Sequence, residues 1–436
     1  MSTRKRFVTN PGGRVGGDIR VPGDKSISHR AAMLGAIAEG TTEVRGFLEG
    51  ADCIATLDAM AAMGIGIERP GAGIVRIRGA GLGGLRAPSA ALDLGNSGTS
   101  MRLLAGLLSG QDFETVLIGD ASLMSRPMER IAAPLRRMGA DVRTNEGRPP
   151  VAIRGGPRLK GIAHHLDVPS AQVKSALLLA GLQAEGRTSV REPAPSRDHT
   201  ERMLEAFGLP IERAAGEVAV AGRARLRATR VDVPGDFSSA AFFIVAALIA
   251  GRGPLTLRDI GVNPTRTALI DILRLMGADI RVQNSTEAGG EPRADIEVHP
   301  GRLRGIAVPE SLVPAALDEM PVLFAAAAVA DGETVVSGAG ELRVKESDRL
   351  AVMARGLADL GISVETRPDG LQIQGGTVRG GVVDSRGDHR VAMAFAVLGA
   401  RANAPIAIDD VQNVTTSFPG FGILAQAVGL GLSESH

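Results

Sequence analysis

The chain has 436 residues, and its 49 basic and 48 acidic residues leave a net charge of +1. This balance argues against a general nucleic-acid or membrane binder, and a content of eleven Phe with no Trp or Tyr leaves few side chains that could stack on bases. The single cysteine, Cys53, excludes an internal disulfide and a thiolate metal cluster, and it fits a reducing compartment.

Hydropathy and length set the expected location and size. The N-terminus, MSTRKRFVTN, is basic but is not followed by the apolar stretch of a secretory signal. The longest apolar runs, near 240–250 and 322–330, have the length of core helices rather than of membrane spans. We therefore expect a cytoplasmic protein without a membrane or nucleic-acid partner, built from two domains or from a few large repeats.

Two series of signals recur along the chain at intervals of about seventy residues. A glycine that follows an amphipathic helix returns at positions 64, 139, 208, 277, 361 and 429. A polar cluster that precedes an apolar run returns about forty residues before each glycine, at Ser26, Ser97, Ser170, Ser238, Asp318 and Asp388. The agreement of both series predicts six units, each with a buried helix, a strand, an amphipathic helix and two further strands.

The chain ends suggest how these units are grouped. The sixth unit stops at LGLSESH, without room for its last strand, while residues 6–21 read as surplus strands that are expected to pair with this tail. We predict one domain of three units at 19–228, and a second at 1–18 and 229–436. The fold class is α/β (α+β), with three parallel buried helices in each domain. Their N-terminal dipole ends would lie on one face, and two such faces opposed across a hinge would hold anions.

The segment PGDKSISHR opens the first unit. Lys25 offers a point charge, Ser26 a hydroxyl and Arg30 a forked cation, and Ser26 or Ser28 is expected to cap the helix that follows. A capped helix with two solvated bases is the alternative interpretation. The return of similar segments in later units favours an anion pocket.

The second unit supplies LGNSGTSMR, in which Gly98 would let a ligand approach the backbone. Further on, Ser125, Arg126 and Pro127 are expected to open a helix with proline at its first position, which would leave Arg126 directed toward a ligand. A simple cap and an exposed arginine are the structural alternatives.

The third unit brings PSAQVKSALLLAG and SRDHTERML. Ser170 is expected to cap a helix, and Gln172 to project from its first turn. Ser196 and Arg197 precede the second helix of the unit. A glutamine near a cap is more often solvated than bound to a ligand.

The fifth unit holds two acidic candidates. Asp318 stands at a helix start, where it serves either as an N-cap or in catalysis. In GELRVKESDRL, Lys345 and Arg349 are expected to share a helix face with Glu346 beside them. A mixed-charge helix end is the alternative.

In the sixth unit, His389 and Arg390 come directly before an apolar helix, where charge is costly unless it faces a ligand. The other histidines, such as His164, His165 and His199, lack metal-ligand spacing. Walker, GxSxG and GxGxxG sequences are also absent from the chain. We therefore expect neither a metal nor a cofactor.

Five of these motifs, PGDKSISHR, LGNSGTSMR, PSAQVKSALLLAGL, ELRVKESDR and DHRVAMAF, together resemble the 5-enolpyruvylshikimate-3-phosphate (EPSP) synthase family, the 3-phosphoshikimate 1-carboxyvinyltransferases. The resemblance runs from about Arg14 to Phe421, and SRDHTE, NPTR and TSFP resemble the class II subgroup, which has glyphosate-tolerant members. It implies a two-domain inside-out α/β barrel of six βαβαββ units. It also implies a monomeric transferase that moves the enolpyruvyl group of phosphoenolpyruvate to shikimate 3-phosphate, on the route to chorismate and aromatic amino acids.

The resemblance assigns residues to both substrates. Shikimate 3-phosphate is expected to contact Lys25, Ser26, Arg30, Ser170, Ala171, Gln172, Ser196, Arg197, Asp318 and Lys345. Phosphoenolpyruvate is expected to contact Lys25, Gly98, Arg126, Gln172, Glu346, Arg349, His389 and Arg390. Asp318 would handle the hydroxyl proton, while Glu346 and Lys25 would serve the methylene carbon. Glu346 could act as an acid only if burial offsets the surrounding cations.

Three positions depart from the family pattern. Ser417 stands before Phe418-Pro419, where many relatives have Lys, and a ring-packing Tyr is absent, so that Arg197 or His199 would take its place. Gly98 lacks the methyl group that crowds glyphosate in tolerant relatives. We therefore predict that glyphosate inhibits this protein and that the protein tolerates it only moderately.

Two other functions remain as alternatives. A UDP-N-acetylglucosamine enolpyruvyl transferase would normally carry a reactive Cys in a loop and Asn after the first Lys, whereas here Cys53 falls in a predicted helix and Ser26 follows Lys25. A non-catalytic anion-binding repeat protein would need the cations but neither Asp318 nor Glu346.

Overall fold

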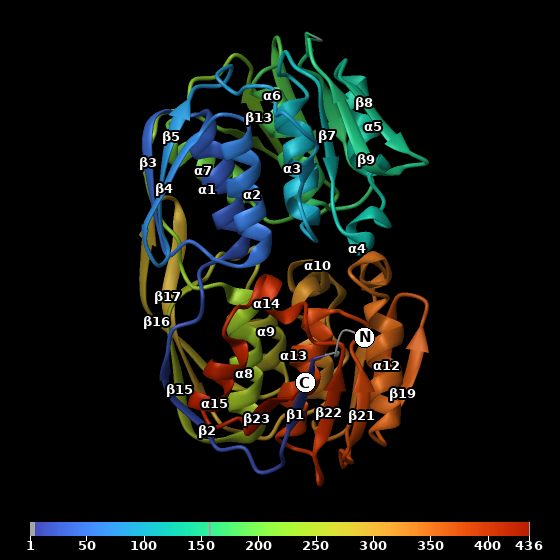
Figure 1. Ribbon diagram of the computed structural model, residues 1–436. Helices are drawn as coiled ribbons and strands as arrows, with labels where there is room; N and C mark the ends of the chain where they lie inside the picture. The colour runs from blue at the N-terminus through green and yellow to red at the C-terminus, as the bar shows by residue number, and fades with distance from the viewer. Residues whose placement is uncertain (1–4, 157, 436) are drawn as a thin grey trace. The chain divides into compact units, whose positions relative to one another are not determined.

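A computed structural model describes residues 5–156 and 158–435. Residues 1–4 and 436, which the domain prediction includes, lie outside the described part. The chain divides into two compact units (Figure 1). Unit 2 comprises Gly23–Val233 and the short segment Glu287–Glu291, and unit 1 comprises the rest. The chain changes unit after Pro22 and after Val233, a few residues beyond positions 18 and 228, and the assignment of Glu287–Glu291 to unit 2 had no signal in the sequence.

Unit 2 contains three sheets of the same design. In each sheet the first strand runs parallel to the second, and an antiparallel hairpin follows. The strand orders are β14 (Arg230–Asp232), β3 (Glu39–Arg45), β5 (Ile74–Ala80), β4 (Gly66–Gly71); β6 (Leu92–Asp93), β7 (Thr115–Ile118), β9 (Arg148–Arg154), β8 (Asp141–Asn145); and β10 (Ala163–His165), β11 (Arg187–Arg191), β13 (Glu217–Ala221), β12 (Glu212–Ala214).

Each sheet of unit 2 is associated with one buried and one amphipathic helix. The buried helices are α1 (Lys25–Ile37), α3 (Gly98–Leu108) and α6 (Ala171–Gly181). The amphipathic helices are α2 (Ala51–Ala62), α5 (Glu129–Arg137) and α7 (His199–Ala206), and a short helix, α4 (Ala121–Met124), precedes α5. Figure 1 shows α3 and α6 side by side, in line with their extensive mutual contact.

Unit 1 repeats this design in two of its three sheets, while its third sheet consists of three antiparallel strands. Its strand orders are β16 (Asp279–Ala288), β17 (Glu291–His299), β15 (Gly251–Gly261), β2 (Val15–Ile19); β18 (Glu333–Val336), β20 (Gly370–Gln374), β19 (Ser363–Arg367); and β21 (Gly381–Asp384), β22 (Ile406–Asp409), β1 (Arg6–Thr9), β23 (Leu432–Ser435). The N-terminal strand β1 pairs with both β22 and β23. The prediction that the strands of residues 6–21 pair with the C-terminal tail is therefore confirmed for β1. It is wrong for β2, which pairs with β15 of the fourth unit.

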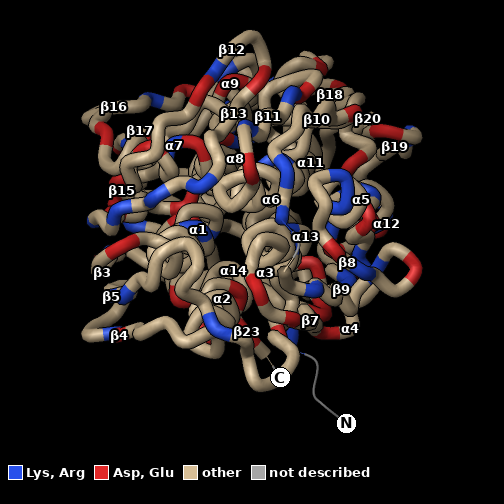
Figure 2. The backbone as a smooth tube through the Cα atoms, turned by 90° about the horizontal axis from the view of Figure 1, so that it is seen from above, with Lys and Arg blue, Asp and Glu red and all other residues tan. Residues whose placement is uncertain are grey.

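The buried helices of unit 1 are α8 (Phe237–Ala250), α11 (Met320–Ala327) and α13 (His389–Gly399). The other elements are α9 (Ala268–Leu275), α12 (Arg349–Asp359), α15 (Phe421–Ala427), α10 (Val313–Ala316), α14 (Val414–Ser417) and the 3-10 turns η1 (Glu310–Leu312), η2 (Leu317–Glu319) and η3 (Gly340–Val344). Helix α8 has no charged residue along its length, so none of the blue or red segments in Figure 2 belongs to it. No helix in the described ranges is both long and apolar enough to cross a membrane.

The repeat signals correspond to real helix ends. All six glycines of the first series have positive φ, from 83° at Gly361 to 98° at Gly139, as expected for a residue that ends a helix in the left-handed region. Six helices begin within two residues of the predicted starts, and Ser97, Ser170 and Asp388 are themselves N-caps. The predicted starts of the buried helices and the glycines predicted to end the amphipathic helices thus match the observed helices.

Three local predictions were wrong. Asp24, not Ser26 or Ser28, caps α1, and its carboxylate accepts from the Ile27 N–H at 2.9 Å. Helix α5 begins at Glu129, so Pro127 lies in the preceding turn rather than at a first helical position. Helix α12 begins at Arg349, so Lys345 precedes the helix and does not share a face with Arg349.

Close packing between helices and sheets depends on small residues late in the buried helices. A Cβ atom at Gly181 would lie 2.7 Å from Cβ of Thr188 in β11, and one at Gly399 would lie 2.6 Å from Cβ of Thr9 in β1. Both distances are too short for any side chain. The repeated glycine therefore sets how near the sheet approaches the helix, which the apolar pattern alone does not reveal.

Candidate active site

The N-terminus of α1 carries the first candidate cation. Lys25 forms an ion pair with Asp52, whose residue is 5% exposed in the first turn of α2. Cys53 Sγ makes a weak contact with the Lys25 carbonyl at 3.7 Å. Lys25 is thereby held by the adjacent helix, and Cys53 is buried in α2, as the sequence predicted.

Arg30 links three helices of unit 2. Its Nε donates to Thr200 Oγ1 at 2.6 Å, its Nη2 to Ser175 Oγ at 2.8 Å, and its Nη1 to the Ser26 carbonyl at 3.0 Å. Burial lowers the pKa of Arg30 to about 10, although the carboxylates of Glu201 and Asp24 oppose this shift. The guanidinium therefore stays charged at neutral pH, and it is fixed between α1, α6 and α7.

The N-termini of α3 and α6 are connected through side chains. Gln172 accepts from Arg102 Nη1 at 2.7 Å and donates to Thr99 Oγ1 at 3.1 Å, so it is not simply solvated. Arg126 donates to Asn96 Oδ1 at 2.6 Å. A Cβ at Gly98 would lie 3.0 Å from Arg126 Nη1 and 3.1 Å from Arg102 Nη1, so this glycine leaves room for both guanidinium groups.

Ser170 and Ser196 both contact one carboxylate. The Ser170 hydroxyl accepts from Val173 N at 3.4 Å and so caps α6, where Ala171 is the first helical residue. Its own N–H donates to Glu192 Oε1 at 2.8 Å, and the Ser196 hydroxyl lies 2.7 Å from the same oxygen.

His199 does not provide the exposed ring that the missing tyrosine would require. The residue is 1% exposed, and its Nδ1 lies 2.7 Å from Glu291 Oε1. Arg197, two residues earlier and half-buried, is the remaining candidate of the two.

In unit 1, three cations surround the Asp318 carboxylate. Lys345 Nζ lies 3.9 Å, Arg349 Nη1 3.6 Å and Arg390 Nη2 3.8 Å from its oxygens. Asp318 lies in the turn η2, and the N-terminus of α11 shows no side-chain cap, so the N-cap interpretation was wrong.

Arg349 is the buried centre of this group. Its Nε donates to Asp388 Oδ2 at 2.8 Å and its Nη2 to Glu346 Oε2 at 2.6 Å. Burial alone would lower the pKa of Arg349, but the carboxylates of Asp388, Glu346 and Asp318 together raise it above the ordinary value. Arg349 is therefore a permanent cation between the acids.

A second buried network lies behind Arg390. Arg390 Nη1 donates to the Asp318 carbonyl at 2.9 Å and lies 3.6 Å from Glu319 Oε1. Ser238 donates to Glu319 and accepts from Arg266 Nη2 at 2.6 Å. His389, 8% exposed, is the first residue of α13 beside Arg390.

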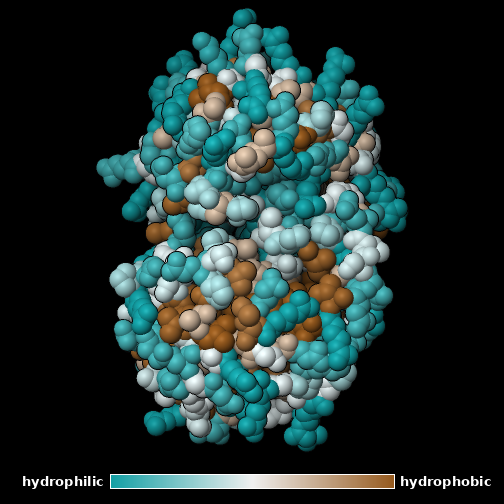
Figure 3. Space-filling view, turned by 180° about the vertical axis from the view of Figure 1, so that it is seen from behind, coloured by the Kyte–Doolittle hydropathy of each residue, from teal (hydrophilic) through white to brown (hydrophobic). Residues whose placement is uncertain are grey.

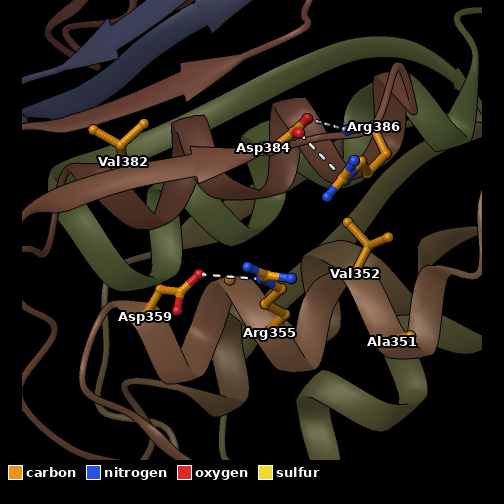
Figure 4. A pocket seen from close by; sticks show the side chains of 8 residues that line it. Ala351, Val352, Arg355, Asp359, Val382, Asp384 and Arg386 are labelled. Carbon is orange, nitrogen blue, oxygen red and sulfur yellow. Dashed lines mark hydrogen bonds and ion pairs between the residues drawn. The ribbon is translucent and has the colours of Figure 1, made fainter.

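Two features outside these groups, a groove on unit 1 and an apolar patch, differ from them in their chemistry. A groove of about 410 Å³ between α12 and β21 contains the pairs Arg355–Asp359 and Arg386–Asp384, at 3.9 and 3.2 Å, and so pairs its own charges (Figure 4). On the face in Figure 3, apolar residues gather on unit 1. No group of three or more His, Cys, Asp or Glu side chains within 5–156 and 158–435 could hold a metal.

The structure thus gathers the sequence-predicted residues into one group in each unit. Those of unit 2 lie at the N-termini of α1, α3 and α6 and in the segment before α7, except Arg126, which lies between α4 and α5 and contacts Asn96 before α3. Those of unit 1 surround Asp318. The sequence analysis missed the partners that hold them, namely Asp52, Arg102, Lys174, Ser175, Glu192, Thr200, Arg266 and Glu319. Lys174, a charge inside the apolar run VKSALLLAG, was the one visible signal.

Repeated α/β units with clustered cations at buried helix N-termini, together with acids paired to arginines, define a protein suited to small multiply charged anions. Comparison with known proteins identifies the family within this class. The family model for EPSP synthase (3-phosphoshikimate 1-carboxyvinyltransferase) matches residues 9–422. The chain belongs to the EPSP synthase family.

Individual relatives agree. The 3-phosphoshikimate 1-carboxyvinyltransferases of Methylococcus capsulatus and Alkalilimnicola ehrlichii are each 59% identical over 430 residues, with 98% of this chain covered and 98% and 96% of theirs. A solved structure of EPSP synthase from Acinetobacter baumannii superposes with a TM-score of 0.89 at 52% identity, over 99% of this chain and 100% of that one.

Proposed function

We propose that this protein transfers the carboxyvinyl group of phosphoenolpyruvate to the 5-hydroxyl of shikimate 3-phosphate and releases phosphate. The observation that carries the proposal is the Asp318 carboxylate, held within 4 Å of Lys345, Arg349 and Arg390. An acid among cations serves a proton transfer between anionic reactants, whereas anion binding alone would need only the cations.

The chemistry requires an addition followed by an elimination. The 5-hydroxyl adds to C2 of phosphoenolpyruvate as C3 gains a proton, and the intermediate then loses a C3 proton and phosphate. We assign the hydroxyl proton to Asp318, and the protons at C3 to Glu346 and Lys25. Shikimate 3-phosphate would contact the hydroxyls and cations of α1, α6 and the segment before α7, and the carboxylate and phosphate of phosphoenolpyruvate would contact Arg126, Arg349 and Arg390.

The same proposal includes the domain architecture, the response to glyphosate, the assembly state and the location of the protein. The strand order shared by five of the six sheets supports two inside-out barrels of three βαβαββ units each, with domains at 19–228 and at 1–18 plus 229–436. Glyphosate would inhibit with moderate tolerance, because Gly98 carries no methyl group. Monomeric assembly and a cytoplasmic location complete the proposal, and size-exclusion chromatography and cell fractionation test them.

One assay tests the activity. The protein with shikimate 3-phosphate and phosphoenolpyruvate should release inorganic phosphate in the presence of EDTA and without nucleotide. With UDP-N-acetylglucosamine as acceptor it should release none, because both comparisons with curated relatives favour the shikimate substrate. Phosphate release with the nucleotide sugar alone would support the alternative transferase and refute the proposal.

A further inference from the structure

The hydrogen bonds around Glu192 concern two residues that the proposed function assigns to shikimate 3-phosphate. Glu192 follows β11, and its side chain is 6% exposed. Its Oε1 accepts from the Ser170 N–H at 2.8 Å and from the Ser196 hydroxyl at 2.7 Å, while its Oε2 lies 2.8 Å from the same hydroxyl. One buried carboxylate therefore contacts two of the residues that the proposed function assigns to shikimate 3-phosphate.

A buried lysine holds this carboxylate. Lys174 Nζ lies 2.8 Å from Glu192 Oε2 and 2.9 Å from Glu201 Oε1, and its side chain is 4% exposed. It also donates to the Ser196 carbonyl at 3.4 Å. Although burial acts to lower the pKa of Lys174, Glu201 and Glu192 raise it above the ordinary value. The ammonium is thus permanently charged, and it sets the orientation of Glu192.

The contacts of Glu192 use both of its oxygens at once. Oε1 serves the Ser170 N–H, Oε2 serves Lys174, and the Ser196 hydroxyl lies near both. A carboxylate can accept at both positions, whereas an amide of the same shape accepts at only one. This site therefore requires a carboxylate, and glutamine is not an adequate replacement.

We propose that Glu192 is a positioning residue for shikimate 3-phosphate: it fixes the Ser170 backbone at the N-terminus of α6 and directs the Ser196 hydroxyl. The proposal rests on the proposed function, since it assumes that this substrate binds at Ser170 and Ser196. The Ser196 proton is donated to Glu192, so Ser196 presents its oxygen lone pairs to the ligand side.

Glu201 offers a matched control. It is 1% exposed and pairs with the same Lys174, yet it has no recorded hydrogen bond to Ser170 or Ser196. In Glu201→Gln the amide oxygen can still accept from Lys174, whereas in Glu192→Gln either Lys174 or the Ser170 N–H faces an NH₂ group. Both variants remove one negative charge from the interior, so their stabilities should fall together while their substrate affinities diverge.

The experiment measures the dissociation constant of shikimate 3-phosphate by calorimetry, and the KM of each substrate, for the wild type, E192Q and E201Q. We expect E192Q to weaken shikimate 3-phosphate binding by about tenfold or more, as for the loss of a hydrogen bond to a charged group. Its KM for phosphoenolpyruvate should change by less than about threefold. E201Q should bind shikimate 3-phosphate as the wild type does.

A spectroscopic readout separates positioning from stability. The Ser170 amide proton, which donates to a carboxylate in the wild type, should move upfield in the NMR spectrum of E192Q and stay in place in E201Q. If E192Q does not fold, Glu192→Asp keeps the charge beside Lys174 but shortens the reach toward Ser170, and the same pattern is expected.

Two results overturn the inference. Equal affinities of E192Q and E201Q for shikimate 3-phosphate, with the wild type binding normally, would refute the role of Glu192 and leave the proposed function intact. Absence of shikimate 3-phosphate binding by the wild type would refute the proposed function, and the inference with it.

Discussion

Asp388 provides the sharpest test of how unit 1 is stabilised. It is fully buried, and Oδ2 accepts from Arg349 Nε at 2.8 Å and from Ser347 Oγ at 3.1 Å. Oδ1 accepts from the Arg390 N–H at 3.0 Å and so caps α13. In Asp388→Asn the amide oxygen can keep the cap, but its NH₂ group then faces the Arg349 guanidinium. The variant thus separates the loss of the buried charge from the loss of the cap.

The expected loss of stability depends on the carboxylates that still pair with Arg349 in the variant. Removing one partner of a buried ion pair costs about 3–5 kcal/mol, and Arg349 keeps Glu346 and Asp318, so the lower end of the range applies. We expect Asp388→Asn to lower the free energy of unfolding of unit 1 by about 3 kcal/mol. Asp388→Ala also loses the cap, which adds about 1 kcal/mol. For a unit of this size the Tm should fall by about 6–12 °C in the asparagine variant.

Urea unfolding followed by circular dichroism measures these values. Asp348 provides the control, because it caps α12 through Ala351 N at 3.0 Å and pairs with Arg343 at 2.9 Å, but with a side chain 37% exposed. Asp348→Asn should cost less than about 1 kcal/mol. Equal losses for Asp388→Asn and Asp348→Asn would refute the reasoning that burial makes the Arg349 pair decisive.

Three further outcomes are expected. Alanine at Asp318 or Glu346 should lower kcat about 10²- to 10⁴-fold with substrate binding kept; turnover within a few-fold of the wild type would favour a non-catalytic protein. Gly98→Ala should raise the KM for phosphoenolpyruvate several-fold, because its methyl group would press on Arg126 Nη1 at 3.0 Å, and an unchanged KM would show that the arginine yields freely. Burial lowers the pKa of His164 to about 4, from 6.5. Between pH 4 and pH 6.5, His164 binds a proton in the unfolded chain but not in the folded one. Its contribution to the free energy of unfolding is therefore fully present above pH 6.5, and it falls by up to about 3 kcal/mol as the pH decreases toward 4. His164→Leu should flatten urea midpoints over this range, and an identical pH profile would contradict the assignment.

The fold could be predicted because its determinants are local. A glycine with positive φ must follow each amphipathic helix, and an uncharged run must be buried, so the repeat is visible within single segments. The errors at Ser26 and Pro127 were also local. Asp24 stands two residues before Ser26 and four before Ser28, and its carboxylate accepts from the Ile27 N–H, so the helix begins earlier than expected. Pro127 falls in the segment between the two short helices α4 and α5.

The site could be predicted only in part, because its supporting contacts join distant segments. Lys174 and Glu192 lie on either side of a strand, and Ser238 is 81 residues from Glu319. A sequence shows each of these residues as an isolated charge or hydroxyl, and nothing in its neighbourhood names the partner. The motifs thus indicated which residues carry the chemistry, while the residues that orient them became visible only in the fold.

The net side-chain charge differs between the site groups of the two units, although the helix dipoles favour anions in both. The charged residues of the unit 2 group include six cations against five carboxylates: Lys25, Arg30, Arg102, Arg126, Lys174 and Arg197 against Asp24, Asp52, Glu192, Glu201 and Glu291. The unit 1 group has four against five: Arg266, Lys345, Arg349 and Arg390 against Asp236, Asp318, Glu319, Glu346 and Asp388. Parallel helix N-termini attract anions in both units, yet only unit 2 adds a net positive charge. We therefore expect unit 2 to contribute more than unit 1 to the capture of phosphorylated substrates, and the surplus carboxylates of unit 1 to suit the transfer of protons.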